Sequence, residues 1–438
     1  MKIAVVGTGI SGLVAAHLLH RDHELIVYEA GEHVGGHTNT IEIEEDGQRL
    51  AVDTGFIVYN ERTYPNFCRL LAQLDVATQP SDMSFSVRDE RSGLEYRGDN
   101  LNTLFAQRRN LLRPSFYRLL GEILRFYRQS PELLALPGEC GGTLGDYLRD
   151  RRYSDDFIHR HLVPMGAAIW SADPQQFLAF PAAYFVRFCH NHGMLSVFNR
   201  PRWRTITGGS ARYVEKLISP FRSRIRLCTP VASVRRAPTH VEILDAHGGK
   251  ERVDRVVLAT HSDRALRLLA DPTPTELAVL GVMRYQRNDT VLHTDERLLP
   301  RSRRAWASWN YHIPAVPRGC ATLTYNMNRL QSLAARRTYC VTLNCTEQVD
   351  ERHVIRRIEY HHPVYTLESI AAQRRWAEIS GVNRTHYCGA YWGYGFHEDG
   401  VNSALAVCRQ FGRMLDERLP SGVDDFVSRP GRQAEAAG

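Results

Sequence analysis

The first thirty residues alternate between apolar runs and short polar breaks in an order that predicts a strand, a helix and a second strand. Residues 2–6 form a mostly apolar run of strand length. Apolar residues at helical spacing begin at Leu13 and continue to Leu19, and a second apolar run covers residues 25–28. Strands joined by a helix in this way are typical of a parallel sheet. The pattern therefore predicts an α/β fold.

Similar runs recur further along the chain and predict a domain built from separate segments. Strands are expected at 224–227, 231–234, 241–244 and 255–260, after a helix over 211–219. We predict a discontinuous nucleotide domain of residues 1–74, 208–262 and 385–419. The two insertions, 75–207 (mostly helical over 101–189) and 263–384 (mixed), would form an α+β substrate domain. Residues 420–438 are mostly small or polar, which predicts a disordered tail.

Glycines occupy the turn between the first strand and the first helix at a fixed spacing. Gly7 permits a tight turn, Gly9 lets the backbone approach a pyrophosphate, and Gly12 allows close helix–strand packing. An acidic residue then closes the second strand, where it would accept hydrogen bonds from ribose hydroxyls. The alternative is a glycine-rich turn without a ligand. The residues predicted to hold a dinucleotide here are Gly7, Gly9, Ile10, Ser11, Gly12, Glu29 and Ala30.

Two further glycine-containing segments could approach a long, flat cofactor. One lies near the first site and contains Gly35, Gly36, His37, Thr38, Gly55 and Phe56. An ordinary loop is the alternative for Gly35 and Gly36 taken alone. The other, residues 388–405, contains Gly389, Gly400, Val401 and Asn402, and helical spacing follows from Ser403 to Leu415. The positive end of that helix would stabilise negative charge on a bound group.

These motifs resemble those of the two-dinucleotide-binding-domain flavoproteins, and within them the flavin-containing amine oxidase and phytoene desaturase superfamily. The resemblance implies a Rossmann-like domain that binds FAD, with the C-terminal motif at the flavin. It also implies that the backbone at Val231 meets the adenosine half of the cofactor. The protein is thus expected to be an FAD-dependent oxidoreductase.

Composition narrows the remaining classes of function. The 438 residues carry 55 basic and 48 acidic side chains, a formal net charge of +7. Zinc-finger spacing, aromatic–basic repeats and long basic tracts are absent from the sequence, so nucleic-acid binding is not expected. Nine dispersed cysteines and no apolar run of membrane-spanning length predict a cytoplasmic location. No metal is expected, because the pairs His159/His161 and His361/His362 would not share a face.

The reacting site should be lined by aromatic groups near the flavin motif. We predict catalytic roles for Trp392, Tyr394 and His397, against the alternative of simple core packing or backbone-bonded polar groups. The segments 191–195 and 203–207 are expected to form the pocket floor or a structural loop. Amine-oxidising relatives hold a water with a lysine, but this chain has only Lys2, Lys216 and Lys250, none in the predicted substrate domain. Simple amine oxidation is therefore disfavoured.

Residues 104–127 interleave aliphatic side chains with arginines, and Pro114 divides them into two predicted amphipathic helices. Basic amphipathic helices can lie on anionic lipid, which would give peripheral membrane contact. A solvated helix pair packed on the domain is the alternative. The arginines in question are Arg108, Arg109, Arg113, Arg118 and Arg125.

Segments 191–193, 203–205 and 391–402 make the chain resemble one subgroup, the bacterial flavoproteins related to the flavin domain of plant cyclopropane fatty acid synthases. This resemblance implies redox work on methylated, cyclopropane or unsaturated lipid acyl chains. A soluble amine or amino-acid oxidase is the second hypothesis. A non-catalytic flavin-binding partner of a lipid methyltransferase is the third.

Overall fold

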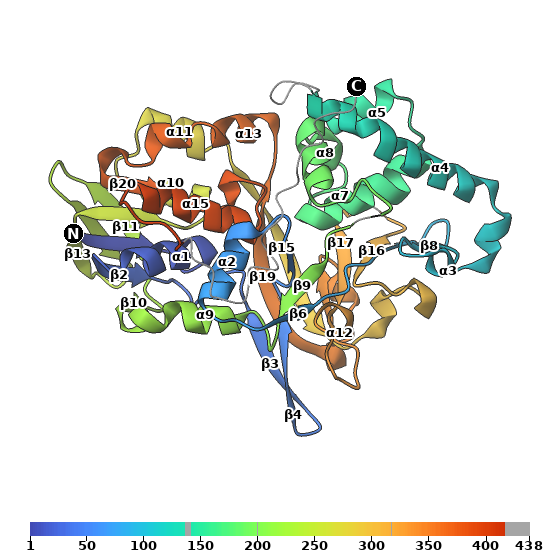
Figure 1. Ribbon diagram of the computed structural model, residues 1–438, viewed down its shortest axis with the longest axis horizontal. Coiled ribbons are helices and arrows are strands. Elements are labelled where there is room, and N and C mark those ends of the chain that lie inside the picture. The colour runs from blue at the N-terminus through green and yellow to red at the C-terminus, as the bar shows by residue number, and fades with distance from the viewer. Residues whose placement is uncertain (136–141, 199, 317, 417–438) are drawn as a thin grey trace, which may run out of the picture.

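The computed structural model describes residues 1–135, 142–198, 200–316 and 318–416. A five-stranded parallel sheet forms the centre of one lobe, shown on the left in Figure 1, with strand order β10-β2-β1-β14-β20. Its strands are β1 (Lys2–Val6), β2 (Glu24–Tyr28), β10 (Ile225–Arg226), β14 (Arg255–Leu258) and β20 (Thr385–Tyr387). All three segments of the predicted nucleotide domain contribute strands to this sheet, and the predicted α/β class is confirmed.

Helices cover this sheet because their apolar faces match its buried strands. Residues of α1 (Ile10–Leu19), α9 (Ala211–Ile218) and α15 (His397–Arg409) share one core cluster with β1 and β2. The helix α2 (Pro65–Gln73) packs into the same cluster. A three-stranded antiparallel sheet, β11 (Val231–Arg236), β12 (Val241–Asp245) and β13 (Lys250–Val253), lies on the other side.

A seven-stranded mixed sheet dominates the second part of the molecule, with strand order β19-β15-β18-β17-β16-β7-β8. All its neighbouring strands are antiparallel except β16 and β7. The strands are β7 (Phe85–Asp89), β8 (Leu94–Arg97), β15 (Arg284–His293), β16 (Trp309–Ile313), β17 (Thr322–Asn326), β18 (Cys340–Leu343) and β19 (Val354–Val364). Smaller sheets join β3 (Thr40–Glu45) to β4 (Gln48–Asp53), and β9 (Trp203–Ile206) to β5 (Tyr59–Asn60) and β6 (Thr78–Pro80).

Helices from residues 101–191 gather on the right in Figure 1. They are α3 (Leu101–Leu104), α4 (Pro114–Gln129), α5 (Leu144–Asp150), α6 (Asp155–Phe157), α7 (Val163–Trp170) and α8 (Ala182–Asn191). The predicted helix before Pro114 is corrected: α3 is followed by a 3-10 helix over Arg108–Leu112. α3 ends before Phe105, whose backbone (φ −95°, ψ 40°) is not helical, and Pro114 starts α4, so the two predicted helices are not continuous with the turn between them.

The segments after residue 262 divide between the two lobes, which the predicted boundaries did not anticipate. The helices α10 (Ser262–Leu268), α11 (Pro274–Leu280), α13 (Leu367–Gln373) and α14 (Trp376–Ile379) lie beside the five-stranded sheet (Figure 1). Ala265, Val279 and Leu280 join the core of that sheet because their apolar side chains bury against β1 and β14. α12 (Met327–Leu330) packs instead on the seven-stranded sheet. The predicted tail at 420–438 lies outside the described residues.

Candidate functional site

The glycine turn between β1 and α1 packs closely on two sides and leaves space on a third. A Cβ on Gly12 would lie 2.0 Å from the Gly7 carbonyl oxygen, and one on Gly7 would lie 2.8 Å from the Ala259 carbonyl oxygen. Gly9 differs, because a Cβ there would meet no atom within 4 Å. No side chain caps the N-terminus of α1, so the free N–H groups of its first turn border this space. The turn thus offers an anion-binding site of the kind a diphosphate needs.

The acidic residue at the end of β2 is near this turn, as its spacing predicts. Glu29 accepts a hydrogen bond from the Thr8 N–H at 3.1 Å and one from the Thr8 hydroxyl, and the Gly31 N–H donates to it at 2.8 Å. The Thr229 N–H donates to the Glu29 carbonyl at 2.8 Å, which brings the start of β11 at Val231 towards the same strand end. The exposed Ala30 follows. The residues predicted for the ribose and adenosine therefore lie together.

The second glycine pair lies directly against the first turn. The Gly35 N–H donates to the Thr8 carbonyl at 3.1 Å, and a Cβ on Gly36 would lie 3.1 Å from the Gly9 Cα. A Cβ on Gly55 would lie 2.1 Å from the His37 carbonyl oxygen, which accepts the Phe56 N–H at 2.7 Å. Only glycine fits at Gly55. The two predicted segments, residues 35–38 and 55–56, therefore lie side by side next to the first glycine turn.

The C-terminal motif meets these loops through a buried polar contact. Thr38 Oγ1 lies 3.0 Å from His397 Nε2 and 2.6 Å from the Tyr213 hydroxyl. The His397 ring stacks on Phe56 with 3.5 Å between ring centroids. A Cβ on Gly400 would lie 2.6 Å from Ile10 Cγ2, so α15 packs tightly on α1. Motifs 360 residues apart in sequence thus converge, as predicted.

The start of the last helix differs from the prediction. α15 begins at His397, six residues before Ser403. Asp399 stabilises this start, because its carboxylate accepts the Phe396 N–H at 2.9 Å. Val401 is buried in the helix interface, while Asn402 is exposed. The Gly389 N–H donates to Ser403 Oγ at 2.9 Å.

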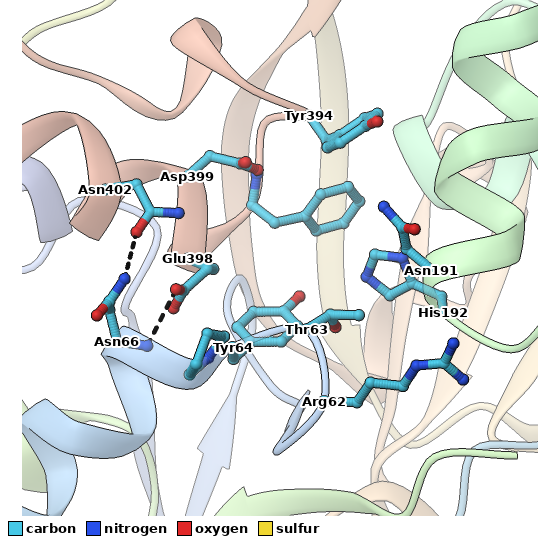
Figure 2. Close-up of a pocket in the computed structure, with 12 residues that line it drawn as sticks. Arg62, Thr63, Tyr64, Asn66, Asn191, His192, Tyr394, Glu398, Asp399 and Asn402 are labelled. Atoms are coloured by element: carbon cyan, nitrogen blue, oxygen red, sulfur yellow. Dashed lines mark hydrogen bonds between the residues drawn. The ribbon is translucent and has the colours of Figure 1, made fainter. Parts of the chain in front are cut away.

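A pocket of about 380 Å³ opens where α2, α8 and α15 approach one another (Figure 2). Tyr394, Phe396 and His192 form one part of its lining. Its rim is polar and carries Arg62, Asn66, Asn191 and Asn402, with Asn66 Nδ2 donating to Asn402 Oδ1 at 2.8 Å. Of the three side chains predicted to be catalytic, only Tyr394 lines this pocket. His397 lies behind it, and Trp392 packs into the core of the five-stranded sheet.

Two carboxylates of the pocket already have backbone partners. Glu398 accepts the Asn66 N–H at 3.0 Å and the Phe67 N–H at 2.9 Å, so it caps the start of α2. Burial raises the pKa of Asp399 to about 7. These residues were missed from sequence, because nothing local indicates that residues 66 and 398 meet.

Four histidines gather beside the glycine loops, an arrangement that no local pattern indicated. His37 lies 5.4 Å from His362 and 6.1 Å from His261 between ring centroids, and His261 lies 6.5 Å from His361. His37 Nε2 is buried without a hydrogen-bond partner. Burial, followed by repulsion among these rings, lowers the pKa of His37 to about 4 and those of His261 and His362 to about 3. Among the described residues, no group of three or more His, Cys, Asp or Glu side chains is arranged to hold a metal.

This cluster predicts acid sensitivity of the FAD-free protein. A histidine has a pKa near 6.5 in the unfolded chain. When folding lowers that pKa, the folded state binds fewer protons, so stability is complete above pH 6.5 and is lost as the pH falls towards 4. We expect the free energy of unfolding to fall from pH 7 to pH 5, and His362→Gln to reduce that fall by about 1–2 kcal/mol. Urea titrations at both pH values measure this; an equal fall in the exposed control His33→Gln and in His362→Gln would contradict it.

The residues present fit an extended dinucleotide. The open space at Gly9, the uncapped α1 and the unpartnered His37 Nε2 follow one another along the path from Glu29 to His397. The family model for flavin containing amine oxidoreductases matches residues 10–286. The chain belongs to this family. The predicted superfamily is confirmed, and this flavin containing amine oxidoreductase is an enzyme with FAD as its cofactor.

Solved structures give the same fold at low sequence identity. Cyclohexylamine oxidase from Brevibacterium oxydans IH-35A is 15% identical, with a TM-score of 0.66 over 94% of this chain and 99% of that one. A putative protoporphyrinogen oxidase from Exiguobacterium sp. 255-15 is 18% identical (TM-score 0.64, 94% and 98% covered). A fatty acid isomerase from P. acnes that produces CLA is 14% identical (TM-score 0.63, 93% and 98% covered). No curated protein matches the chain.

Proposed function

We propose that this oxidoreductase oxidises or desaturates a lipid acyl chain, as the resemblance to the flavin domain of plant cyclopropane fatty acid synthases implies. The observation that carries the proposal is a pocket with an aromatic inner wall, a polar rim and no lysine. Phe188 stacks on Phe396 at 5.2 Å and Tyr184 lies 4.4 Å from Tyr394, between ring centroids. Such a wall suits an apolar chain, and the amides and Arg62 at the rim suit a polar head group.

The three lysines support a substrate other than a simple amine. Lys2 lies on β1 and pairs with Glu251, and Lys216 lies on α9 beside Asp75. Lys250 begins β13. The chain therefore has no lysine to hold a water in the pocket.

In this proposal, one group of residues would bind FAD and another would orient the substrate. The turn at Gly7, Gly9 and Gly12 and the start of α1 would hold the diphosphate of FAD, and Glu29 its ribose. Bound FAD supplies the acceptance of two electrons that the oxidation needs. Tyr394 and Phe396 would orient the substrate, because Trp170 and Tyr184 fix their loop by donating to the Tyr394 and Gly393 carbonyls at 3.0 and 2.9 Å.

A soluble amine or amino-acid oxidase is a second candidate, favoured by Glu398 and Asp399 in the pocket lining. A cationic amine would pair with such carboxylates. Against this, both already accept backbone N–H groups, and burial raises the pKa of each. The third hypothesis, a non-catalytic partner of a lipid methyltransferase, does not suit a member of a family of flavin containing oxidoreductases. A lipid methyltransferase is kept as a proposed partner of the enzyme.

We expect phospholipid dispersed in detergent to be oxidised under air to a product that lacks two hydrogens, and amines to give no peroxide or ammonia. Mass spectrometry of the lipid and a peroxide assay measure both outcomes.

Asn191→Trp should fill the pocket and slow lipid oxidation by roughly tenfold or more, which corresponds to about 1.4 kcal/mol of lost stabilisation. The exposed control Gln48→Trp, on β4 and away from the pocket, should react normally. Peroxide and ammonia from an amine, with unchanged lipid, would favour the second candidate.

A further inference from the structure

One outer surface of the helical lobe combines unpaired positive charge with exposed aliphatic groups. We call it the basic rim. Its cations are Arg108, Arg109, Arg113, Arg118 and Arg128, and its apolar side chains are Leu101, Leu111, Leu112, Tyr117 and Leu124. Figure 1 shows α3 and α4 at the edge of the lobe that faces away from the five-stranded sheet.

The apolar part of the rim is unusually exposed for side chains of this size. Leu112 is 88% exposed and Leu101 is 75% exposed. Within the described part of the chain, sixteen large hydrophobic side chains are exposed, and five of them belong to the rim. Exposed hydrophobic side chains need not cluster on helices that are merely solvated. They do cluster on a surface that binds a membrane or another apolar partner.

The helix α4 has one face that packs on the lobe and one face that is exposed to solvent. Phe116, Leu119 and Phe126 are buried and attach the helix to the lobe. On the outer face, Tyr117 and Leu124 lie seven residues apart, two helical turns, and so on one line. Arg118 and Arg128 are exposed beside them. Tyr117 contacts only the neighbouring residues Phe105 and Leu111 among the described residues, and Leu124 is exposed, so the described part of the chain leaves this outer face open to solvent.

The rim's arginines also lack the acidic partners that their neighbours have. Arg149 and Arg151 pair with Asp146 and Glu132. In the described residues, none of the rim's five arginines is within ion-pair distance of a carboxylate; Arg108 and Arg109 donate only to the Phe105 and Gly93 carbonyls and to Asn102. Residues 101–129 contain one acidic residue, Glu122, which accepts the Ser154 N–H. Arg125 is excluded from the rim, because it lies over the Tyr153 ring.

We propose that the basic rim docks this protein on the surface of a membrane rich in anionic lipid. The argument is charge complementarity: several uncompensated arginines attract an anionic surface, and the exposed leucines enter the headgroup boundary. This inference rests on the proposed function, since an acyl chain in a bilayer must be reached from the surface.

Cosedimentation of the FAD-loaded protein with vesicles tests the rim. Binding to vesicles of phosphatidylglycerol and phosphatidylcholine should exceed binding to phosphatidylcholine alone, and should fall as salt rises because the attraction is screened. Arg108→Gln/Arg109→Gln/Arg113→Gln should lower binding about a hundredfold and keep its FAD. Leu112→Gln, which disturbs no packing, should also lower it. The matched control, Arg287→Gln/Arg336→Gln/Arg352→Gln, changes three exposed arginines elsewhere and should bind like the original protein.

The outcomes separate docking from the reaction. Equal binding of the rim variants and the control, or no binding to anionic vesicles, would overturn the docking proposal. If detergent-dispersed lipid is nevertheless oxidised, only docking fails. If vesicles bind as expected and no lipid is oxidised in either form, the docking stands and the proposed substrate fails.

Discussion

Replacing Gly9 with valine will leave a folded protein that holds almost no FAD. The fold tolerates the change, because the φ of Gly9 is −65° and no atom lies within 4 Å of a Cβ there. The side chain will instead occupy the space bordered by the N–H groups of α1, where the diphosphate must lie. We expect FAD released by heat denaturation to fall roughly tenfold or more, with a thermal unfolding midpoint like that of the FAD-free protein.

Two other glycines make the experiment specific. Gly98→Val also adds a side chain to open space, but away from the loops, and should keep its FAD. Gly12→Val places its Cβ against the Gly7 carbonyl, so it should fail to fold stably. Normal FAD content in Gly9→Val would show that the open space at Gly9 has no part in binding.

Replacing Asp53 with alanine will destabilise the protein by about 3–5 kcal/mol, because it removes one acceptor from four buried donors. Asp53 is 0% exposed. It accepts the Ser210 N–H at 2.9 Å and hydroxyl at 2.7 Å, the Thr40 hydroxyl at 2.6 Å and the Gln331 amide at 2.9 Å. These donors come from three segments that are distant in sequence, and Ser210 and Gln331 are buried, so the loss of Asp53 would leave their N–H and O–H groups short of an acceptor.

Urea unfolding of the FAD-free protein measures this effect. The control is Asp150→Ala, which removes an exposed carboxylate at the end of α5 and should change the free energy of unfolding by less than about 1 kcal/mol. If both variants unfold at the same urea concentration, Asp53 does not join the segments as we infer.

The sequence predicted the parts of the site that depend on local geometry. Gly7, Gly9 and Gly12 are recognisable because the turn between a strand and a helix needs glycine at these three positions, and their spacing is fixed. The predicted start of α15 is too late, because residues 397–402 are mostly polar and show no apolar helical pattern. The hydrogen bond from the Phe396 N–H to the Asp399 carboxylate stabilises the helix start instead. The pocket and the histidine cluster could not be predicted, since Asn66 meets Asn402, and His37 meets His362, only after separate elements have packed.

The route of the chain through the five-stranded sheet also has a consequence for biosynthesis. β1 and the glycine turn emerge from the ribosome long before β20, which completes that sheet, and before α15, whose His397 contacts Thr38 and Phe56. β1 therefore lacks its neighbour β14 until residue 258 has emerged, and the far edge of β14 then stays without a neighbour until β20 has emerged. We expect chaperones that shield such an edge to raise the amount of holoenzyme that a cell accumulates. The supply of FAD should matter once residue 409 has emerged, because the last segment of the cofactor site is then in place.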